Sequence, residues 1–190
     1  MKTLFITAII FIIGISCNQK PRNPVAVADS INEAKQGQAA LNETVTADSI
    51  SAAFLVRAIT TGMKETELAR IEGSNGNIPS VKNFAVTIQT GFNALNESIR
   101  QLAIQKNITL PDSNSAATQK EINRLSDQKG SQLDKQFIKE VIGDHKTSVE
   151  YYEAAAKNAG DTDVRAFADK NLPALQANLD SAKSILKKYW

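Results

Sequence analysis

The strongest constraint on this chain is a pattern of apolar residues that occurs twice, 83 residues apart. Phe54 aligns with Phe137, Val81 with Val164, and the two apolar stripes and the turn between them align without a gap. A pair of helices cannot bury its apolar faces by itself, so two such pairs are expected to pack against each other. The repeat therefore predicts an all-α fold: an antiparallel four-helix bundle built from a duplicated helical hairpin.

Four segments carry the apolar spacing of amphipathic helices. They run over about 48–72, 79–109, 133–158 and 162–187, and Asp161 or Thr162 is expected to cap the last of them. Short turns at 73–76 and 159–160 make the members of each pair antiparallel. The longer connection, 112–130, lets the chain cross along the bundle as in ferritin-like folds, and we expect a short extra helix within it at about 119–125.

Residues 1–16 have the pattern of a signal peptide, in which Lys2 precedes an apolar run over 4–13. Small residues then lead to Cys17, the only cysteine in the protein. The arrangement resembles the bacterial lipobox, in which the cysteine is acylated and becomes the mature N-terminus, although Gly14 stands where that motif usually has leucine. A lipidated Cys17 would anchor the protein to a membrane. The alternative is an ordinary secretory signal.

The next segment, 17–45, is polar and contains two prolines, so we expect a tether that holds the domain away from the membrane. A weak helix over 29–41 is conceivable, but Gly37 interrupts it. The four-helix domain then spans 46–190. Because no acidic run follows Cys17, we expect a lipid-anchored protein of the cell envelope that faces the periplasm.

The charge balance argues against a nucleic-acid partner. Lys and Arg number 22 and Asp and Glu 20, a net charge of +2, and loss of residues 1–16 removes Lys2 and leaves 21 against 20. Such a weak charge attracts polyanions poorly, and we find no nucleic-acid motif. The one partner that the sequence predicts is a membrane, reached through acyl chains on Cys17. It does not identify a protein or small-molecule partner.

Several polar residues interrupt the apolar stripes and are the chemical candidates of the core. They are Glu65, Asp144, His145, Asn171 and Asn178. Burial of such groups costs free energy unless they are hydrogen-bonded, so we expect Glu65, His145 and Asn178 to form a hydrogen-bonded layer. A structural layer of this kind helps to set helix register. An enzyme-like pair, in which Glu65 and His145 shift each other's pKa, is the alternative.

A metal centre would need more ligands than these residues supply. Di-iron bundles use a Glu from each of two helices and a Glu-x-x-His from each of the other two. This chain has one histidine in total and no Glu-x-x-His. We therefore predict no metal, no other cofactor and no catalytic residue. A kink at Pro173 could open a small pocket, which leaves a small-ligand carrier as an alternative.

The order of several short motifs is similar to that of a known family. The motifs are Phe54-Leu-Val-Arg-Ala, Gly62-Met-Lys-Glu-Thr-Glu-Leu-Ala, Val81-Lys-Asn-Phe-Ala, Asp144-His145, Val164-Arg-Ala-Phe-Ala and Leu172-Pro-Ala-Leu-Gln. Over about 48–186 the chain resembles the ferritin-like outer-membrane or periplasmic proteins known as domain of unknown function 4142. The resemblance implies a ferritin-like bundle in the cell envelope and no established reaction.

The chain departs from that family's pattern at two positions. Phe92 stands where such proteins usually carry the histidine of an Asp-His pair, and Asn178 replaces another histidine. Only Glu65, Asp144 and His145 remain. We therefore expect a non-catalytic binding, structural or stress-related role, with a degenerate metal-dependent enzyme or a small-ligand carrier as the alternatives.

Overall fold

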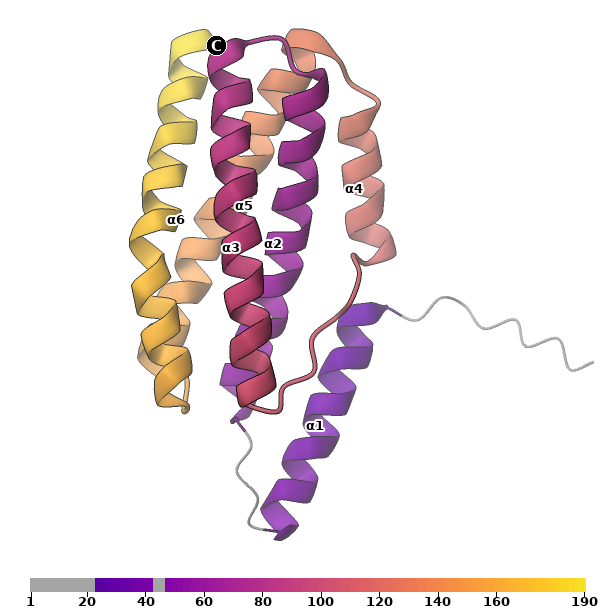
Figure 1. Ribbon diagram of the computed structural model, residues 1–190, viewed down its shortest axis with the longest axis vertical. Coiled ribbons are helices and arrows are strands. Elements are labelled where there is room, and N and C mark those ends of the chain that lie inside the picture. Colours follow the sequence, from indigo (N-terminus) through magenta and orange to yellow (C-terminus); the bar gives the residue numbers. More distant parts are fainter. Residues whose placement is uncertain (1–22, 43–46) are drawn as a thin grey trace, which may run out of the picture.

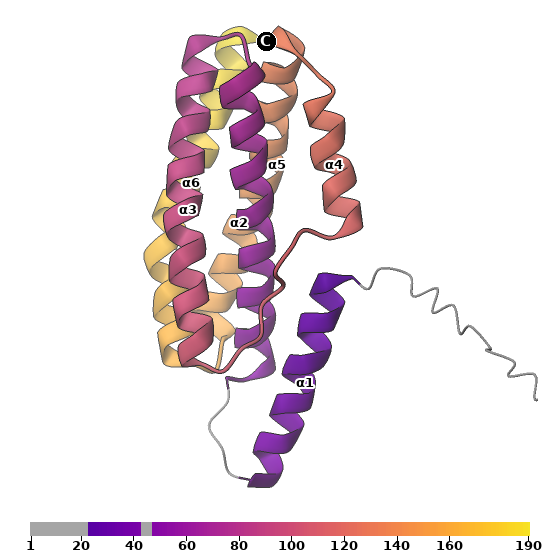
Figure 2. The same cartoon turned by 45° about the vertical axis from the view of Figure 1, so that its right-hand side comes forward.

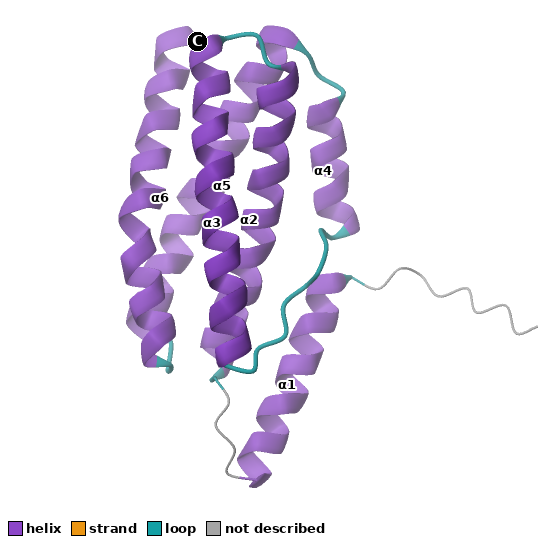
Figure 3. Cartoon of the chain, in the orientation of Figure 1, coloured by secondary structure: helices purple, strands orange, loops and turns teal. Residues whose placement is uncertain are grey.

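The computed structural model describes residues 23–42 and 47–190, and all regular structure in this part of the chain is helical (Figures 1 and 3). The helices are α1 (Pro24–Asn42), α2 (Ser49–Asn75), α3 (Pro79–Gln105), α4 (Ala116–Ser126), α5 (Gly130–Asn158) and α6 (Thr162–Tyr189). The predicted all-α class is confirmed, with six helices. The predicted signal peptide and Cys17 lie outside the described residues.

The four long helices lie side by side, and α1 and α4 lie on one side of them (Figure 1). α2 packs along α3, α5 packs along α6, and α2 also contacts α5. The helix ends repeat at the interval seen in the sequence: α2 ends at Asn75 and α5 at Asn158, while α3 begins at Pro79 and α6 at Thr162. α4 occupies the predicted short helix and extends it at both ends.

Aspartates cap two of the long helices at the same end of the molecule. Asp48 accepts the backbone N–H groups of Ile50 and Ser51, and Asp161 accepts two N–H groups at the start of α6. Asp48 also accepts the N–H of Asp161 at 3.0 Å, which joins the two helix starts. Asp161, one of the two caps that the sequence predicts for this helix, is therefore the cap observed.

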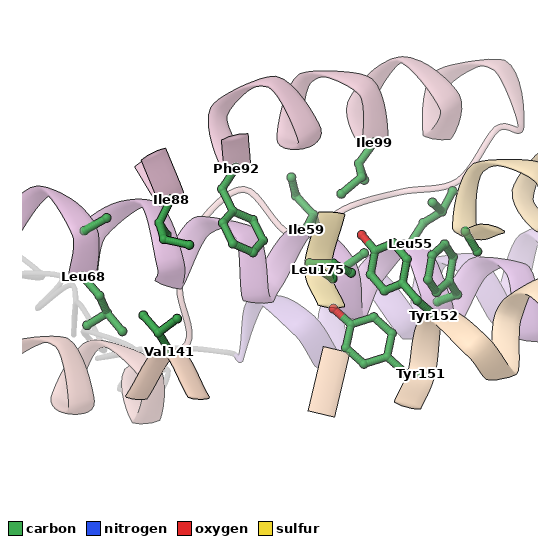
Figure 4. Packing of buried hydrophobic residues seen from close by; sticks show 14 of the residues in the cluster. Leu55, Ile59, Leu68, Ile88, Phe92, Ile99, Val141, Tyr151, Tyr152 and Leu175 are labelled. Carbon is green, nitrogen blue, oxygen red and sulfur yellow. The ribbon is translucent and has the colours of Figure 1, made fainter. Parts of the chain in front are cut away.

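Large apolar side chains from all four long helices fill the interior (Figure 4). The labelled members are Leu55, Ile59 and Leu68 of α2, Ile88, Phe92 and Ile99 of α3, Val141, Tyr151 and Tyr152 of α5, and Leu175 of α6. Burial of each such side chain contributes about 1.5–3 kcal/mol to folding. Within residues 23–42 and 47–190, no helix has both the length and the apolar character needed to cross a membrane.

α1 differs from the weak helix expected within a tether. It covers 19 residues, runs through Gly37, and packs against α2 and the loop that follows α3 (Figures 1 and 2). Asn32 holds that loop with two hydrogen bonds: its Nδ2 donates to the Thr109 carbonyl at 2.9 Å, and its Oδ1 accepts the Thr109 N–H at 2.7 Å. Lys35 Nζ donates to the Asn107 carbonyl at 3.0 Å. α1 is thus held by polar contacts as well as by its packing on α2, and apolar periodicity does not reveal the polar contacts.

Candidate functional site: a buried polar seam between α2 and α5

The predicted polar residues do not form one layer. Glu65 of α2 and His145 of α5 are fully buried, whereas Asn171 and Asn178 of α6 are half-buried. Asn171 Nδ2 donates to the carbonyl of Phe167 in its own helix at 2.8 Å. In the described part of the chain, no hydrogen bond joins Glu65, His145 and Asn178. The structure instead brings Glu65 together with Asp144. In place of the expected layer there is a row of polar side chains between α2 and α5, which we call the seam: Lys64, Glu65 and Glu72 of α2, and Asp134, Asp144 and His145 of α5.

Glu65 and Asp144 form a carboxyl pair in this seam. Neither side-chain oxygen of Glu65 has a donor among the described residues. Burial raises the pKa of Glu65 well above its ordinary value, and the charge of Asp144 and its hydrogen bond with Glu65 raise it further. Glu65 therefore ionises less readily than an ordinary glutamate, and its carboxyl group lies close enough to that of Asp144 for the two to interact.

Lys64 supplies the positive charge of the seam. Its Nζ lies 2.9 Å from Asp144 Oδ2, 3.0 Å from Glu121 Oε2 on α4 and 3.7 Å from Glu140 Oε2. Burial lowers the pKa of Lys64, but the charge of Asp144 and the hydrogen bonds to Asp144 and Glu121 outweigh it and raise this pKa overall. Arg124 of α4 also binds Glu140, at 2.8 Å. Lys64 thus neutralises the carboxyl pair and also holds α4 on the bundle.

His145 lies beside this pair in a neutral form. Its Nδ1 is 3.0 Å from the Val141 carbonyl of the preceding turn, so Nδ1 carries the proton and donates it. Burial lowers the pKa of His145 to about 4. Its Nε2 has no partner within the described residues, and the ring of Phe92 packs edge-on at 5.5 Å between ring centroids.

A second carboxyl pair lies two turns further along α2. Glu72 and Asp134 are both fully buried. Asp134 Oδ1 accepts the backbone N–H groups of Asn77 at 2.9 Å and Ile78 at 3.2 Å. Ile78, the N-cap position of α3, has no side chain able to cap, so Asp134 of α5 caps α3 from across the bundle.

The pKa of Glu72 is raised for the same reasons as that of Glu65. Burial, then the hydrogen bond and the charge of Asp134, raise the pKa of Glu72 to about 8. At neutral pH Glu72 therefore remains mostly protonated and donates to Asp134. The seam as a whole contains two acid pairs, each with a glutamic acid on α2 and an aspartate on α5.

Glu72→Gln should make the protein less sensitive to rising pH. In the unfolded chain Glu72 ionises near pH 4.5, but in the folded chain it keeps its proton to about pH 8. Wild-type stability should therefore fall across this window and level off above it. Because glutamine preserves the donor to Asp134 without ionising, the stability of the variant relative to wild type should rise by about 3.5 kcal/mol between pH 5 and pH 8.

Urea unfolding at pH 5, 6, 7 and 8 measures this difference. Glu153→Gln, at an exposed position of α5, is the matched control and should leave the profile unchanged. Parallel profiles for Glu72→Gln and wild type would contradict the assignment of a shared proton.

The seam does not fit a di-metal centre. It has one imidazole, and Lys64 binds Asp144 at 2.9 Å. Across residues 23–42 and 47–190, no group of three or more His, Cys, Asp or Glu side chains is placed to hold a metal ion. The ring of Phe92 packs against the His145 ring. The donor set is therefore one imidazole beside carboxyl groups that interact with each other and with Lys64.

Five surface hollows in the described part of the chain are not lined by either carboxyl pair or by Pro173. The hollow on α4 does reach the ion cluster, because Glu121 and Arg124 contribute to its lining. One, between α2 and α5, is mainly apolar, and Phe54, Arg57 and Tyr151 contribute to its lining. Pro173 itself is exposed on α6. The pocket predicted near Pro173 does not coincide with any of these hollows.

The family of the chain follows from a match over most of its length. A family model described as "Domain of unknown function (DUF4142)" matches residues 33–185, from the middle of α1 to the last turns of α6. The chain belongs to this family. The resemblance inferred from the motifs is therefore confirmed, and the matched DUF4142 region includes part of the segment that was expected to be a tether.

Two solved structures share the fold with this DUF4142 chain. A fragment of a DUF305 protein from Deinococcus radiodurans has a TM-score of 0.67 at 14% identity, covering 75% of this chain and 99% of its own. A DUF305 protein from Streptomyces coelicolor, described as a candidate secreted protein, has a TM-score of 0.60 at 12% identity, covering 73% and 93%. No curated protein matches the sequence. At these identities the likeness concerns the fold alone.

Sequence reasoning missed three members of the seam: Lys64, Glu72 and Asp134. Glu72 was detectable, because positions 65, 68 and 72 share one face of a helix. Lys64 was hidden because its stem runs along the helix surface while its charged end reaches Asp144. Asp134 had no local signal, since its partners are backbone groups 56 and 57 residues away.

Proposed function

We propose that this DUF4142 protein is a lipid-anchored cell-envelope protein with a non-catalytic binding, structural or stress-related role. Its working unit is a ferritin-like four-helix bundle of α2, α3, α5 and α6, formed by a duplicated hairpin, with α1 and α4 as additions. The recurrence of helix ends at one interval supports the duplication.

The observation that carries the non-catalytic role is the pairing of the buried polar groups with one another. The carboxyl group of Glu65 interacts with that of Asp144, and Lys64 balances the charge of Asp144 at 2.9 Å. A catalytic acid or base must reach a substrate. These groups instead lie against each other, and neither Glu65 nor Asp144 lines any of the five surface hollows described above.

Location in the envelope is supported by the N-terminal sequence. An apolar run follows Lys2 and leads to Cys17, as in an acylated exported protein. The structural neighbour from Streptomyces coelicolor, described as a candidate secreted protein, agrees with export.

Cys17→Ala should abolish lipidation and release the protein from membranes. The thiol is the acceptor of the acyl chains, and without them little apolar surface remains to hold the protein on a bilayer. Labelling cells with a clickable fatty acid, followed by membrane fractionation, measures both effects. Ser113→Ala, at an exposed position, should behave as wild type. Unchanged membrane association of Cys17→Ala would refute the anchor.

A degenerate metal-dependent enzyme is the second candidate, because the Nε2 of His145 is buried without a partner in the described chain. A metal-binding histidine often donates its other ring N–H to a carbonyl, as Nδ1 does here with Val141. Elemental analysis of protein purified without chelator separates the two candidates. Stoichiometric iron, manganese or zinc that is lost in His145→Ala and retained in Lys146→Ala would overturn the non-catalytic proposal.

A further inference from the structure

The docking of α1 shortens the link between the proposed anchor and the folded body. α1 begins at Pro24, seven residues after Cys17. An extended chain advances at most ~3.3–3.6 Å per residue, so this link reaches about 25 Å. A free tether from Cys17 to Ala47 would reach about 100 Å by the same rule. The contacts of Asn32 and Lys35 with the loop after α3 therefore determine how far the body can move from the membrane.

The link leaves the body from its side. Pro24 and Val27 line a surface hollow together with residues 109–113, next to the start of the α3–α4 connection. Figures 1 and 2 show this region on the side opposite α6. An anchor attached there favours a side-on approach to the membrane.

Two exposed apolar side chains lie close to this point. Val27 and Ile31 are 37% and 40% exposed and lie four residues apart, on one face of α1. They flank the docked face, which contains the buried Ala28. Apolar side chains held near acyl chains can enter the membrane interface and add to the anchor. The exposed apolar residues of α3, Val86 and Ile104, lie about five turns apart and form no such pair.

We infer that docked α1 holds one side of the bundle against the lipid surface. This is the side that bears α1 itself and residues 109–113. The occupant of this face is the membrane to which Cys17 is anchored. The inference rests on the proposed acylation of Cys17, and it adds an orientation and a contact surface to that proposal.

Energy transfer from single labels to acceptor lipids tests the orientation. Cys17 is the only cysteine and is acylated, so one introduced cysteine takes one label. Acylated full-length Ser113→Cys and Ala177→Cys, both at exposed positions, are reconstituted in liposomes that contain a fluorescent acceptor lipid. Helices pack 8–10 Å apart, so the two sites differ by roughly 20 Å in distance from the membrane. Transfer should be higher at Ser113 than at Ala177.

Undocking α1 should remove this difference. Ala28→Asp with Asn32→Ala places a charge in the buried contact and deletes both hydrogen bonds to Thr109. Ser30→Ala, on an exposed part of α1, is the control and should retain the difference. A flexible Gly-Ser insert of about 20 residues between Arg22 and Asn23 lengthens the link without changing the folded part. This insert should also remove most of the difference in energy transfer between the two sites.

The outcomes distinguish a failure of this inference from a failure of the proposed lipid anchor at Cys17. Wild-type protein that does not co-sediment with liposomes would contradict the lipid anchor. Two results would overturn the inferred orientation and leave the lipid anchor intact. One is membrane-bound protein with equal energy transfer at Ser113 and Ala177. The other is a difference in transfer that persists in both the undocked and the lengthened chains.

Discussion

Lys64→Met should lower the free energy of unfolding by about 3 kcal/mol, because it removes the cation from a largely buried cluster of carboxyl groups. The Lys64 side chain is 12% exposed and lies within 4 Å of Asp144, Glu121 and Glu140. Methionine matches the length and shape of the lysine stem but leaves these charges facing one another. Loss of one partner from a buried ion pair typically costs 3–5 kcal/mol, and the partial exposure of Asp144 places this case at about the lower end.

Urea unfolding at pH 7 of the chain without its signal peptide and acyl group measures the loss. Lys183→Met is the matched control, because Lys183 pairs with Asp180 at 3.6 Å on the exposed face of α6. Its effect should stay within about 0.5 kcal/mol. Asp144→Asn in the Lys64→Met background should recover much of the stability, since it removes the unbalanced charge. A cost below about 1 kcal/mol for Lys64→Met would show that the cluster is screened by solvent.

Asp134→Ala should cost about 3 kcal/mol, since it removes two functions of one carboxylate. The side chain caps α3 by accepting the N–H groups of Asn77 and Ile78, and it accepts the proton of Glu72. Loss of an N-cap costs about 0.5–2 kcal/mol, and a buried acid left without its acceptor adds about 1–3 kcal/mol.

Asp134→Asn tests whether this effect comes from hydrogen bonding. It keeps the Oδ1 acceptor for the backbone and should cost clearly less than alanine. Asp112→Ala, at an exposed loop position, should change stability by less than about 0.5 kcal/mol. Equal costs for Asp134→Asn and Asp134→Ala would contradict the cross-bundle cap and point to the loss of negative charge alone.

The sequence predicted some members of the candidate site but not how they pair. Glu65 and His145 occupy core-facing positions of their stripes, and the structure buries both completely. The expected partner of Glu65 was His145, whereas the structure pairs it with Asp144. Periodicity along one helix assigns a residue to a face. It contains no information on the axial offset between two helices, which decides which side chains meet across the contact.

The docking of α1 also could not be predicted from the periodicity of its own sequence. Its apolar stripe is thin, so the sequence predicted a tether with a weak helix. Its stability on the bundle depends on Asn32 and Lys35, whose partners are backbone and side-chain groups of residues 107–109, more than 70 residues away. Such partners exist only after α3 and its following loop are in place.

The amino-acid pattern alone determined that this chain folds into helices, roughly where the four long ones lie, and that it resembles the DUF4142 family. These features follow from local rules of apolar spacing and turn residues, repeated in two halves of the chain. Tertiary structure alone decided that glutamic acids of α2 meet aspartates of α5, that Asp134 caps a helix other than its own, and that α1 docks. Each of these depends on a distance between residues far apart in the chain, and such a distance is set by how the helices pack.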